Sequence, residues 1–263
     1  MPTARKLICR LMRSLPNSLR SGVASIRTSD GGHFKIVQPF NSDDGRRLFV
    51  EGEESFEPET ALIFRGIVKR AGTFMDIGAN IGFYALIAKY YNPAVKVFAF
   101  EPEERAYTLL VESIQVNGWV DVTAERLALA DFDGNGTLYL SRRETEASLN
   151  QAFRSECTAQ PCLVRTLDSY CREHEINRID FLVIDTESTE PQVLAGGREV
   201  IGDCKPDIIC EVLKGRTEAT LMHFLKPLGY RFYHLTHEGP VARMMIEGDP
   251  TYRCLNYLFT TTS

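Results

Sequence analysis

The sequence predicts a doubly wound α/β fold, in which a mostly parallel sheet carries helices on both faces. From residue 60 onward, strand-like apolar runs alternate with stretches of helical periodicity, which is typical of successive β-α-β units. The run VKVFAFEP is mostly apolar at both alternating sets of positions, as expected of a strand that is covered on two faces. The length of 263 residues suits one such domain with a short appendage.

Helix-ending residues separate the predicted elements. Gly72, Pro93 and Asn117-Gly118 each end a predicted helix, because glycine favours helix-terminating conformations and proline cannot continue a helix. The predicted helices are 58–72, 80–92, 103–118, the second part of 161–176, 190–202 and 217–230. The predicted strands are 73–78, 95–102, 121–131, 179–187, 207–213, 231–236 and 254–261. Two further strands are predicted within longer stretches: one follows the turn in 131–142, and a short one precedes the helix in 161–176.

Other segments are predicted with less regular structure. Residues 30–60 are expected to form an irregular or β extension, and the polar residues 143–160 either a surface loop or a lid. Asp168 is expected to cap the helix within 161–176. Because little helical sequence separates the last two strands, one antiparallel strand is expected near the C-terminus. The expected domains are a basic N-terminal extension, 1–29, and one domain, 30–263, with its core at 70–263.

Charge is unevenly distributed along the chain. The net charge is −5, but the first 29 residues hold six basic residues and no acid, which leaves 24 basic and 35 acidic residues, or −11, in the rest. This acidic body argues against binding of nucleic acid. The basic segment is expected to form a solvated helix, a weak contact with a membrane or partner, or an organellar presequence. No apolar run approaches the roughly 18 residues of a membrane span.

Cysteine usage indicates a reducing compartment, and we therefore expect a cytoplasmic protein. The chain has seven cysteines, which is an odd number, and none of them forms a Cys-x-x-Cys pair. Cys210 and Cys254 lie in or near strand-like apolar runs and are expected to be buried as small hydrophobic residues.

The turn DIGANIG joins a predicted strand to a predicted helix, the usual ligand position in a doubly wound sheet. Gly78 lets the backbone turn, and Gly82 lets a ligand or backbone come close. Asn80 and Phe83 stand where a dinucleotide fingerprint needs glycine, and no Gly-Lys-Ser/Thr sequence of a P-loop follows. Asp76 would repel a pyrophosphate but attract an ammonium group, directly or through water.

Glu101 ends the next predicted strand, where its carboxylate can accept the hydroxyls of a ribose. The turn and Glu101 together call for a ribose without a pyrophosphate and for a cationic group near Asp76. S-adenosylmethionine fits this description. The alternatives are a purely structural turn with a solvated glutamate, and an NAD-dependent oxidoreductase, which the glycine spacing disfavours.

Six blocks in order resemble those of FkbM-type methyltransferases, which are class I S-adenosylmethionine-dependent O-methyltransferases. These blocks are MDIGANIGFYAL, VFAFEPEERAYTLLVESIQVNG, LALADFDGNGTLYL, VRTLDSY, IDFLVIDTESTEPQVLAGG and PDIICEV. The resemblance covers about residues 70–213. It implies a Rossmann-like sheet of seven strands with the last one antiparallel, and a hydroxyl of a sugar, glycan or polyketide-like small molecule as acceptor. The cofactor-binding residues it implies are Asp76, Gly78, Ala79, Asn80, Gly82, Glu101, Ala128 and Leu129, the last two beside the adenine.

One block departs from the family pattern. The family usually has Lys-Ile-Asp-Val-Glu-Gly-x-Glu where this chain has VIDTESTE, so that Val183 replaces the lysine and Ser188 the glycine. Because serine does not readily take a positive φ, we expect an altered backbone after this strand and a shifted acceptor preference. The same departure motivates an alternative in which the chain is a non-catalytic binding protein on a methyltransferase fold.

Acidic residues cluster at the predicted strand ends on the acceptor side. Asp185 is the first candidate for a general base, because it ends the central strand beside the expected methyl position. Glu187 and Glu211 are further catalytic candidates, since converging acids raise one another's pKa. Two alternatives remain: these acids hold a divalent cation, or Glu190 is only a helix N-terminal acid favoured by the helix dipole. We assign no metal ligands.

Overall fold

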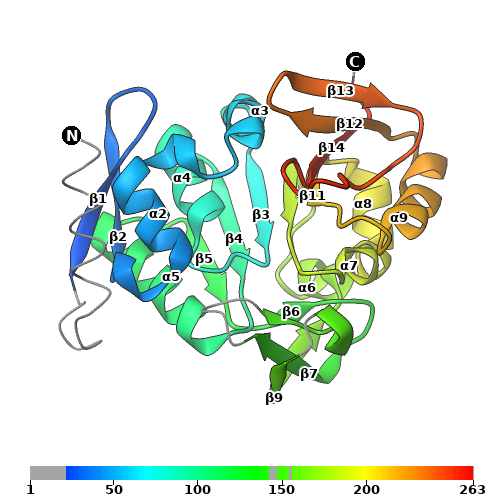
Figure 1. Cartoon of the computed structure of the whole chain (residues 1–263). Helices are drawn as coiled ribbons and strands as arrows, with labels where there is room; N and C mark the ends of the chain where they lie inside the picture. The colour runs from blue at the N-terminus through cyan, green and yellow to red at the C-terminus, as the bar shows by residue number, and fades with distance from the viewer. Residues whose placement is uncertain (1–21, 142–146, 154–155, 263) are drawn as a thin grey trace.

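The computed structural model describes residues 22–141, 147–153 and 156–262, and a large sheet with helices on both faces forms its centre (Figure 1). The strands of this sheet are β3 (Thr73–Ile77), β4 (Lys96–Phe100), β5 (Val122–Glu125), β10 (Phe181–Ile184), β11 (Asp207–Glu211), β12 (Arg231–Thr236), β13 (Gly239–Arg243) and β14 (Asn256–Thr260). Their spatial order is β13-β12-β14-β11-β10-β3-β4-β5. The chain therefore moves outward from β3 to one edge and then restarts beside β3 at β10, so the strand order reverses between these two strands.

The predicted α/β class and the mostly parallel sheet are confirmed. Neighbours from β5 to β11 pair in parallel, whereas β14 lies antiparallel between β11 and β12. The sheet has eight strands rather than the seven that the resemblance implied. The additional strand is β13, which forms a hairpin with β12 at the sheet edge.

Different helices cover the two faces of the sheet. One face carries α3 (Pro58–Val68), α4 (Phe83–Tyr91) and α5 (Glu104–Asn117). The other face carries α6 (Leu167–Glu173), α7 (Glu190–Gly196), α8 (Arg198–Cys204) and α9 (Glu218–Leu225), which a short 3-10 turn, η5 (Lys226–Leu228), follows. Strand side chains alternate between the cores: Phe181 and Val183 join the first, and Leu182 and Ile184 the second. Burial on both faces explains the uniformly apolar strands.

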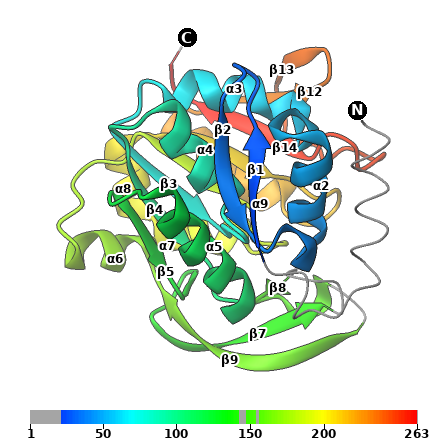
Figure 2. The ribbon, with the colours of Figure 1, turned by 90° about the vertical axis from the view of Figure 1, so that its left-hand side faces the viewer.

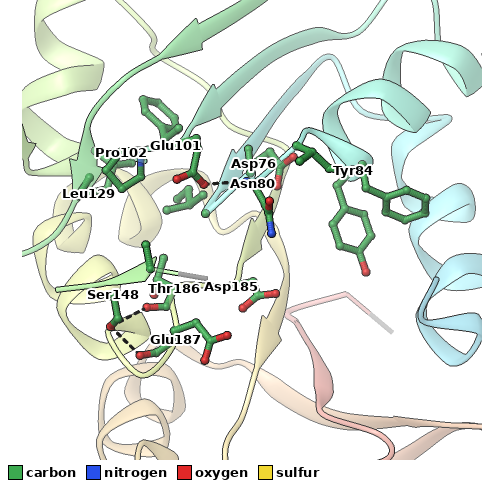
Figure 3. A pocket seen from close by; sticks show the side chains of 18 of the residues that line it. Asp76, Asn80, Tyr84, Glu101, Pro102, Leu129, Ser148, Asp185, Thr186 and Glu187 are labelled. Carbon is green, nitrogen blue, oxygen red and sulfur yellow. Dashed lines mark hydrogen bonds between the residues drawn. The ribbon is translucent and has the colours of Figure 1, made fainter. Parts of the chain in front are cut away.

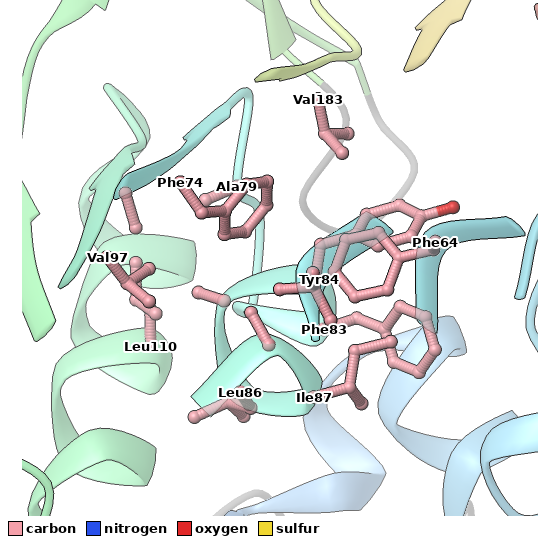
Figure 4. Close-up of a cluster of buried hydrophobic side chains, with 14 of the residues drawn as sticks. Phe64, Phe74, Ala79, Phe83, Tyr84, Leu86, Ile87, Val97, Leu110 and Val183 are labelled. Carbon is pink, nitrogen blue, oxygen red and sulfur yellow. The ribbon is translucent and has the colours of Figure 1, made fainter. Parts of the chain in front are cut away.

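Aromatic side chains fill the centre of the first core (Figure 4). The ring of Phe64 in α3 lies 5.5 Å from that of Phe74 in β3, 5.3 Å from Phe181 in β10 and 4.9 Å from Tyr84 in α4, measured between centroids. Such offset aromatic contacts stabilise packing beyond their buried area. They fix α3 and Tyr84 relative to the central strands.

The N-terminal part of the described chain packs against the first core. It contains β1 (Val23–Arg27), β2 (His33–Val37), η2 (Pro39–Asn41), α2 (Asp43–Glu51) and η3 (Glu53–Ser55). The prediction for residues 30–60 missed α2. Ser42 caps the N-terminus of this helix, because its side chain accepts a hydrogen bond from the Gly45 amide. The hairpin β1–β2 lies against α5 (Figure 2), where the Val37 amide donates to Ser113 Oγ at 3.1 Å.

The boundary predicted after residue 29 falls in the turn of the β1–β2 hairpin. Most of the predicted basic extension, residues 1–21, lies outside the described ranges. No helix within those ranges is long and apolar enough to cross a membrane. The six described cysteines are free thiols, and the predicted burial of Cys210 and Cys254 is confirmed.

A second sheet was only partly predicted. It consists of β6 (Ala128–Leu129), β7 (Gly134–Ser141), β8 (Ala147–Ser148) and β9 (Cys157–Arg165), in the order β6-β9-β7-β8, with a 3-10 turn, η4 (Gln151–Phe153), before β9. The strand predicted at 121–131 divides between the two sheets as β5 and β6. The segment predicted as irregular, 143–160, contains β8 and the start of β9. Much of β9 is exposed, and this hides the apolar signal of a strand.

Two helix predictions are corrected in detail. Thr166, not Asp168, caps α6, by accepting a bond from the Ser169 amide. Asp168 instead accepts bonds from the amides of Glu199 and Val200 and so caps α8 from a distance in sequence. The helix predicted at 190–202 breaks at Gly197 into α7 and α8.

A comparison of two glycine substitutions tests the closest backbone contact in the fold. Gly78 has a φ of 84°, and a β-carbon there would lie 1.8 Å from the carbonyl oxygen of Asp185. We expect Gly78→Ala to lower the free energy of unfolding by about 2–5 kcal/mol, from left-handed strain plus overpacking. The control Gly66→Ala, in α3 with open space around the new methyl, should raise it by about 0.5–1 kcal/mol. Urea denaturation measures both, and equal effects would contradict this assignment.

Candidate active site

The described residues enclose a cavity at the carboxyl ends of β3, β4 and β10, where the strand order reverses (Figure 3). The cavity holds about 270 Å³, whereas one water needs roughly 10–15 Å³. Its wall is formed by the turn after β3, the end of β4, the loop after β10, the second sheet, α2 and the residues that precede α3. This is the position at which doubly wound sheets bind ligands.

Backbone hydrogen bonds fix the turn after β3. The amides of Gly78 and Ala79 both donate to the Phe100 carbonyl at 3.0 Å. Asn80 has a φ of 49°, and its amide donates to Glu101 Oε2 at 2.8 Å. The turn and the end of β4 therefore form one unit, which holds Glu101 at the cavity wall.

Two carboxyls of this unit lie in a poorly solvated position. Burial raises the pKa of Glu101 to about 8 and that of Asp76 to about 7. Asp76 Oδ2 accepts a bond from the Ala85 amide at 2.9 Å, which ties the start of α4 to β3. Asn80 Oδ1 is buried and receives no hydrogen bond in the described part of the chain. This end of the cavity thus presents acceptors to a ligand that carries donors or positive charge.

The opposite end of the cavity is formed by the loop after β10. Figure 3 shows Asp185, Thr186 and Glu187 across the cavity from Asp76 and Glu101. Burial, followed by the charge of Glu187, raises the pKa of Asp185 well above its usual range. The charged form of Asp185 is therefore disfavoured at this position.

The second sheet is joined to this loop through Ser148. Ser148 Oγ, on β8, donates to the Glu187 carbonyl at 2.8 Å (Figure 3). It also accepts a bond from the Asn150 amide at 3.0 Å. Ser148 is buried and lines the cavity together with Ala147 and Leu149. Residues 147–149 of segment 143–160 thus form part of the cavity wall.

Ser188 takes a positive φ, which serine does not readily adopt. Ser188 has a φ of 81°, and Glu187 before it has a φ of 54°, so both residues occupy the left-handed region that favours glycine. The Ser188 amide donates to Glu190 Oε1 at 3.0 Å, and Ser188 Oγ accepts a bond from Arg216 at 2.9 Å. These bonds hold a serine in a conformation typical of glycine.

The cavity brings together most of the predicted site residues. Those that line it are Asp76, Gly78, Ala79, Asn80, Glu101, Ala128, Leu129, Asp185 and Glu187. Gly82 is not among them. The absence of a side chain at Gly82 instead makes room for Leu110 of α5. Glu211 is buried and also does not line the cavity, and the charge of Asp185 contributes, after burial, to raising its pKa.

The remaining acidic candidate, Glu190, has structural partners. Its Oε1 accepts bonds from the amides of Thr186 and Ser188, so this carboxyl shapes the loop at the start of α7. Within the described ranges, no group of three or more His, Cys, Asp or Glu side chains is arranged to hold a metal ion.

Several residues that line the cavity were not predicted from the sequence. Asp44 and Arg47 come from α2, Phe56 and Glu57 from the residues before α3, and Tyr84 from α4. Tyr84 lies shortly after the glycine turn, and helical spacing could have predicted that it lines the cavity. The others come from a segment without a motif, and the path of the chain around the core brings them to the cavity.

Comparisons with known proteins agree on a methyltransferase. The methyltransferase FkbM domain model matches residues 76–232. The chain is similar to the 2-O-methyltransferase NoeI of Sinorhizobium fredii, with 28% identity over 176 residues that cover 59% of this chain and 70% of that protein. It is also similar to Methyltransferase 1 of Beauveria bassiana, with 22% identity over 176 residues that cover 59% of this chain and 71% of that protein.

Among solved structures, the crystal structure of Methyltransferase FkbM from Methylobacillus flagellatus aligns with a TM-score of 0.49 and 16% sequence identity. The alignment covers 72% of this chain and 43% of that one.

The raised pKa values predict how stability depends on pH. Asp76 and Glu101 keep a proton in the folded chain up to about pH 7 and 8, whereas in the unfolded chain they lose it near pH 4. The folded state therefore binds more protons in this window, and the free energy of unfolding should fall as pH rises from 5 to 8, by up to about 1.4 kcal/mol per pH unit and group. Carboxyls with a lowered pKa, such as Asp180, change the free energy of unfolding only at pH values below this window.

Urea denaturation at pH 5 and pH 8 measures this loss, and Glu101→Gln removes one of the two groups. We expect the variant to lose less stability than the wild type between these pH values. An unchanged or larger loss would contradict the assignment of a raised pKa to Glu101.

Proposed function

Because the chain belongs to the methyltransferase FkbM domain family, we propose that it transfers a methyl group from S-adenosylmethionine to a hydroxyl oxygen of a sugar, glycan or polyketide-like acceptor. The observation that carries this proposal is the cavity in which hydrogen-bond acceptors at the ends of β3 and β4 face the acidic loop after β10. The name of the relative 2-O-methyltransferase NoeI supports oxygen as the methylated atom.

The residues at the β3–β4 end suit this cofactor. Glu101 is placed to accept hydrogen bonds from the ribose hydroxyls, and Ala128 and Leu129 offer an apolar surface to the adenine. Asp76 and the unpaired Asn80 Oδ1 suit the cationic amino-acid end. When bound, S-adenosylmethionine supplies a methyl group that its sulfonium already activates.

The protein then has to align the acceptor and manage its proton. Asp185 and Glu187 lie at the other end of the cavity, where they can hold the acceptor hydroxyl in position. A sugar hydroxyl is a weak nucleophile at neutral pH, so a carboxylate that takes its proton accelerates transfer. Asp185 is the candidate that the sequence provides for this role.

Titration calorimetry with S-adenosylmethionine tests cofactor use. The wild type should bind it, and Glu101→Ala should weaken binding by about tenfold to a hundredfold, since the buried ribose hydroxyls lose their hydrogen-bond partner. Glu104→Ala is the matched control, because this acid is exposed on α5 and does not line the cavity. The proposal would be contradicted if the folded wild type did not bind S-adenosylmethionine at millimolar concentration, or if it bound NADH instead.

Asp185→Asn tests the acceptor end. We expect it to bind cofactor as the wild type does and to lose about a hundredfold or more in kcat on a panel of glycans and hydroxylated metabolites, because an acceptor contact is changed at the reacting atom. Mass spectrometry of the products measures transfer. Cofactor binding without transfer by the wild type across the panel would instead favour a non-catalytic binding protein.

A further inference from the structure

Glu57 reaches the cavity from a part of the chain that the family model does not cover. It directly precedes α3, whereas the model begins at residue 76. Glu57 is partly buried and lines the cavity together with Asp185 and Tyr84. This carboxyl therefore belongs to the same site as the predicted residues.

One oxygen of Glu57 is fixed and the other is available. Oε2 accepts hydrogen bonds from the Tyr84 hydroxyl and from Asn256 Nδ2, the latter at 2.6 Å. Asn256 also donates to Thr60 Oγ1 at 3.1 Å. Every bond recorded for this carboxyl within the described ranges ends on Oε2. The side chain is thus held by one oxygen, while Oε1 remains open to a ligand.

The backbone of Glu57 is strained. Its φ of 43° and ψ of 62° lie in the left-handed region, which a glutamate rarely adopts, and Pro58 restricts it further. Such strain costs about 1–3 kcal/mol and is typically found where a functional position requires it. Here the strained backbone of Glu57 at the start of α3 directs the Glu57 carboxyl toward Tyr84.

Glu57 is the carboxyl that connects the two ends of the cavity electrostatically. Burial is the main cause of the raised pKa values of Asp76 at one end and Asp185 at the other, and the charge of Glu57 contributes to both. Burial raises the pKa of Glu57 itself to about 7, with added contributions from Glu59 and Asp44, while the bond from Tyr84 lowers it. A carboxyl that titrates near neutral pH is suited to accept a proton, whereas the pKa of Asp185 lies well above its usual range.

We propose that Glu57 is a second catalytic residue of the acceptor site, whose Oε1 takes the proton of the acceptor hydroxyl while Asp185 holds that hydroxyl in place. This inference rests on the proposed methyl transfer. In the reaction, a bond forms between the acceptor oxygen and the methyl carbon, and the carbon–sulfur bond breaks with its electron pair left on sulfur. The hydroxyl proton passes to Glu57, which releases it to solvent afterwards. Charge and atoms balance without a further reactant.

Glu57→Gln tests the proposal with little change of shape, because the glutamine carbonyl can still accept from Tyr84 and Asn256. On an acceptor found in the panel, we expect kcat to fall by about a hundredfold or more, and KM to change by less than about fivefold. In the wild type, kcat should rise with pH through a limb near pH 7, and this limb should vanish in the variant. Glu54→Gln, an exposed neighbour outside the cavity, is the matched control and should behave like the wild type.

Tyr84→Phe separates a catalytic from a merely structural role. It keeps the Glu57 carboxylate but removes a donor that stabilises its charged form, so the limb should move to higher pH. Carbon-13 NMR of the glutamate carboxyls gives a readout independent of turnover. The resonance that Glu57→Gln removes should titrate near pH 7 in the wild type and at higher pH in Tyr84→Phe.

The outcomes separate this inference from the proposed function. If Glu57→Gln keeps the wild-type kcat or retains the limb, Glu57 does not take the proton, and methyl transfer itself stands. If the wild type transfers no methyl group to any acceptor, the proposed function fails and this inference fails with it. Calorimetry should show cofactor affinity within about fivefold of the wild type in Glu57→Gln, and a larger loss would assign Glu57 to cofactor binding instead.

Discussion

The cavity depends on the close approach of two strand ends, where Gly78 after β3 packs against the backbone of Asp185 after β10. No side chain fits between them, since a β-carbon on Gly78 would overlap the Asp185 carbonyl oxygen. The same turn is held from its other side by the Phe100 carbonyl at the end of β4. Three parallel strands are thereby locked in register at their carboxyl ends, and the residues that follow them converge on one space.

This convergence places acids where water is scarce. Asp76, Glu101 and Asp185 follow or end the buried strands, so desolvation raises the pKa of each. In the free protein the charged form of each carboxyl is therefore disfavoured. A cationic or hydroxyl-bearing ligand would replace the missing water and give each carboxyl a partner.

The segments around the central sheet complete the acceptor end. Ser148 connects the second sheet to the loop after β10, and Asn256 connects β14 to Glu57 ahead of α3. In the same loop, Ser188 occupies a conformation that favours glycine, and Glu190 and Arg216 hold it there with hydrogen bonds. A serine thus adopts a backbone that favours glycine, because its neighbours provide the stabilisation that glycine would not need.

The sequence by itself determined the fold class and the residues that line the cavity at the ends of β3 and β4. Alternating strands and helices predict the parallel sheet, and local spacing places Asp76, Asn80 and Glu101, because a strand end, a turn and a helix start are close in sequence. At the opposite end, beside the predicted Asp185 and Glu187, only the tertiary structure decided which further residues line the cavity. Glu57 is brought there by long-range packing that carries no local pattern. The same holds for the position of Glu211, which a strand-end prediction put in the cavity and which the packing places outside it.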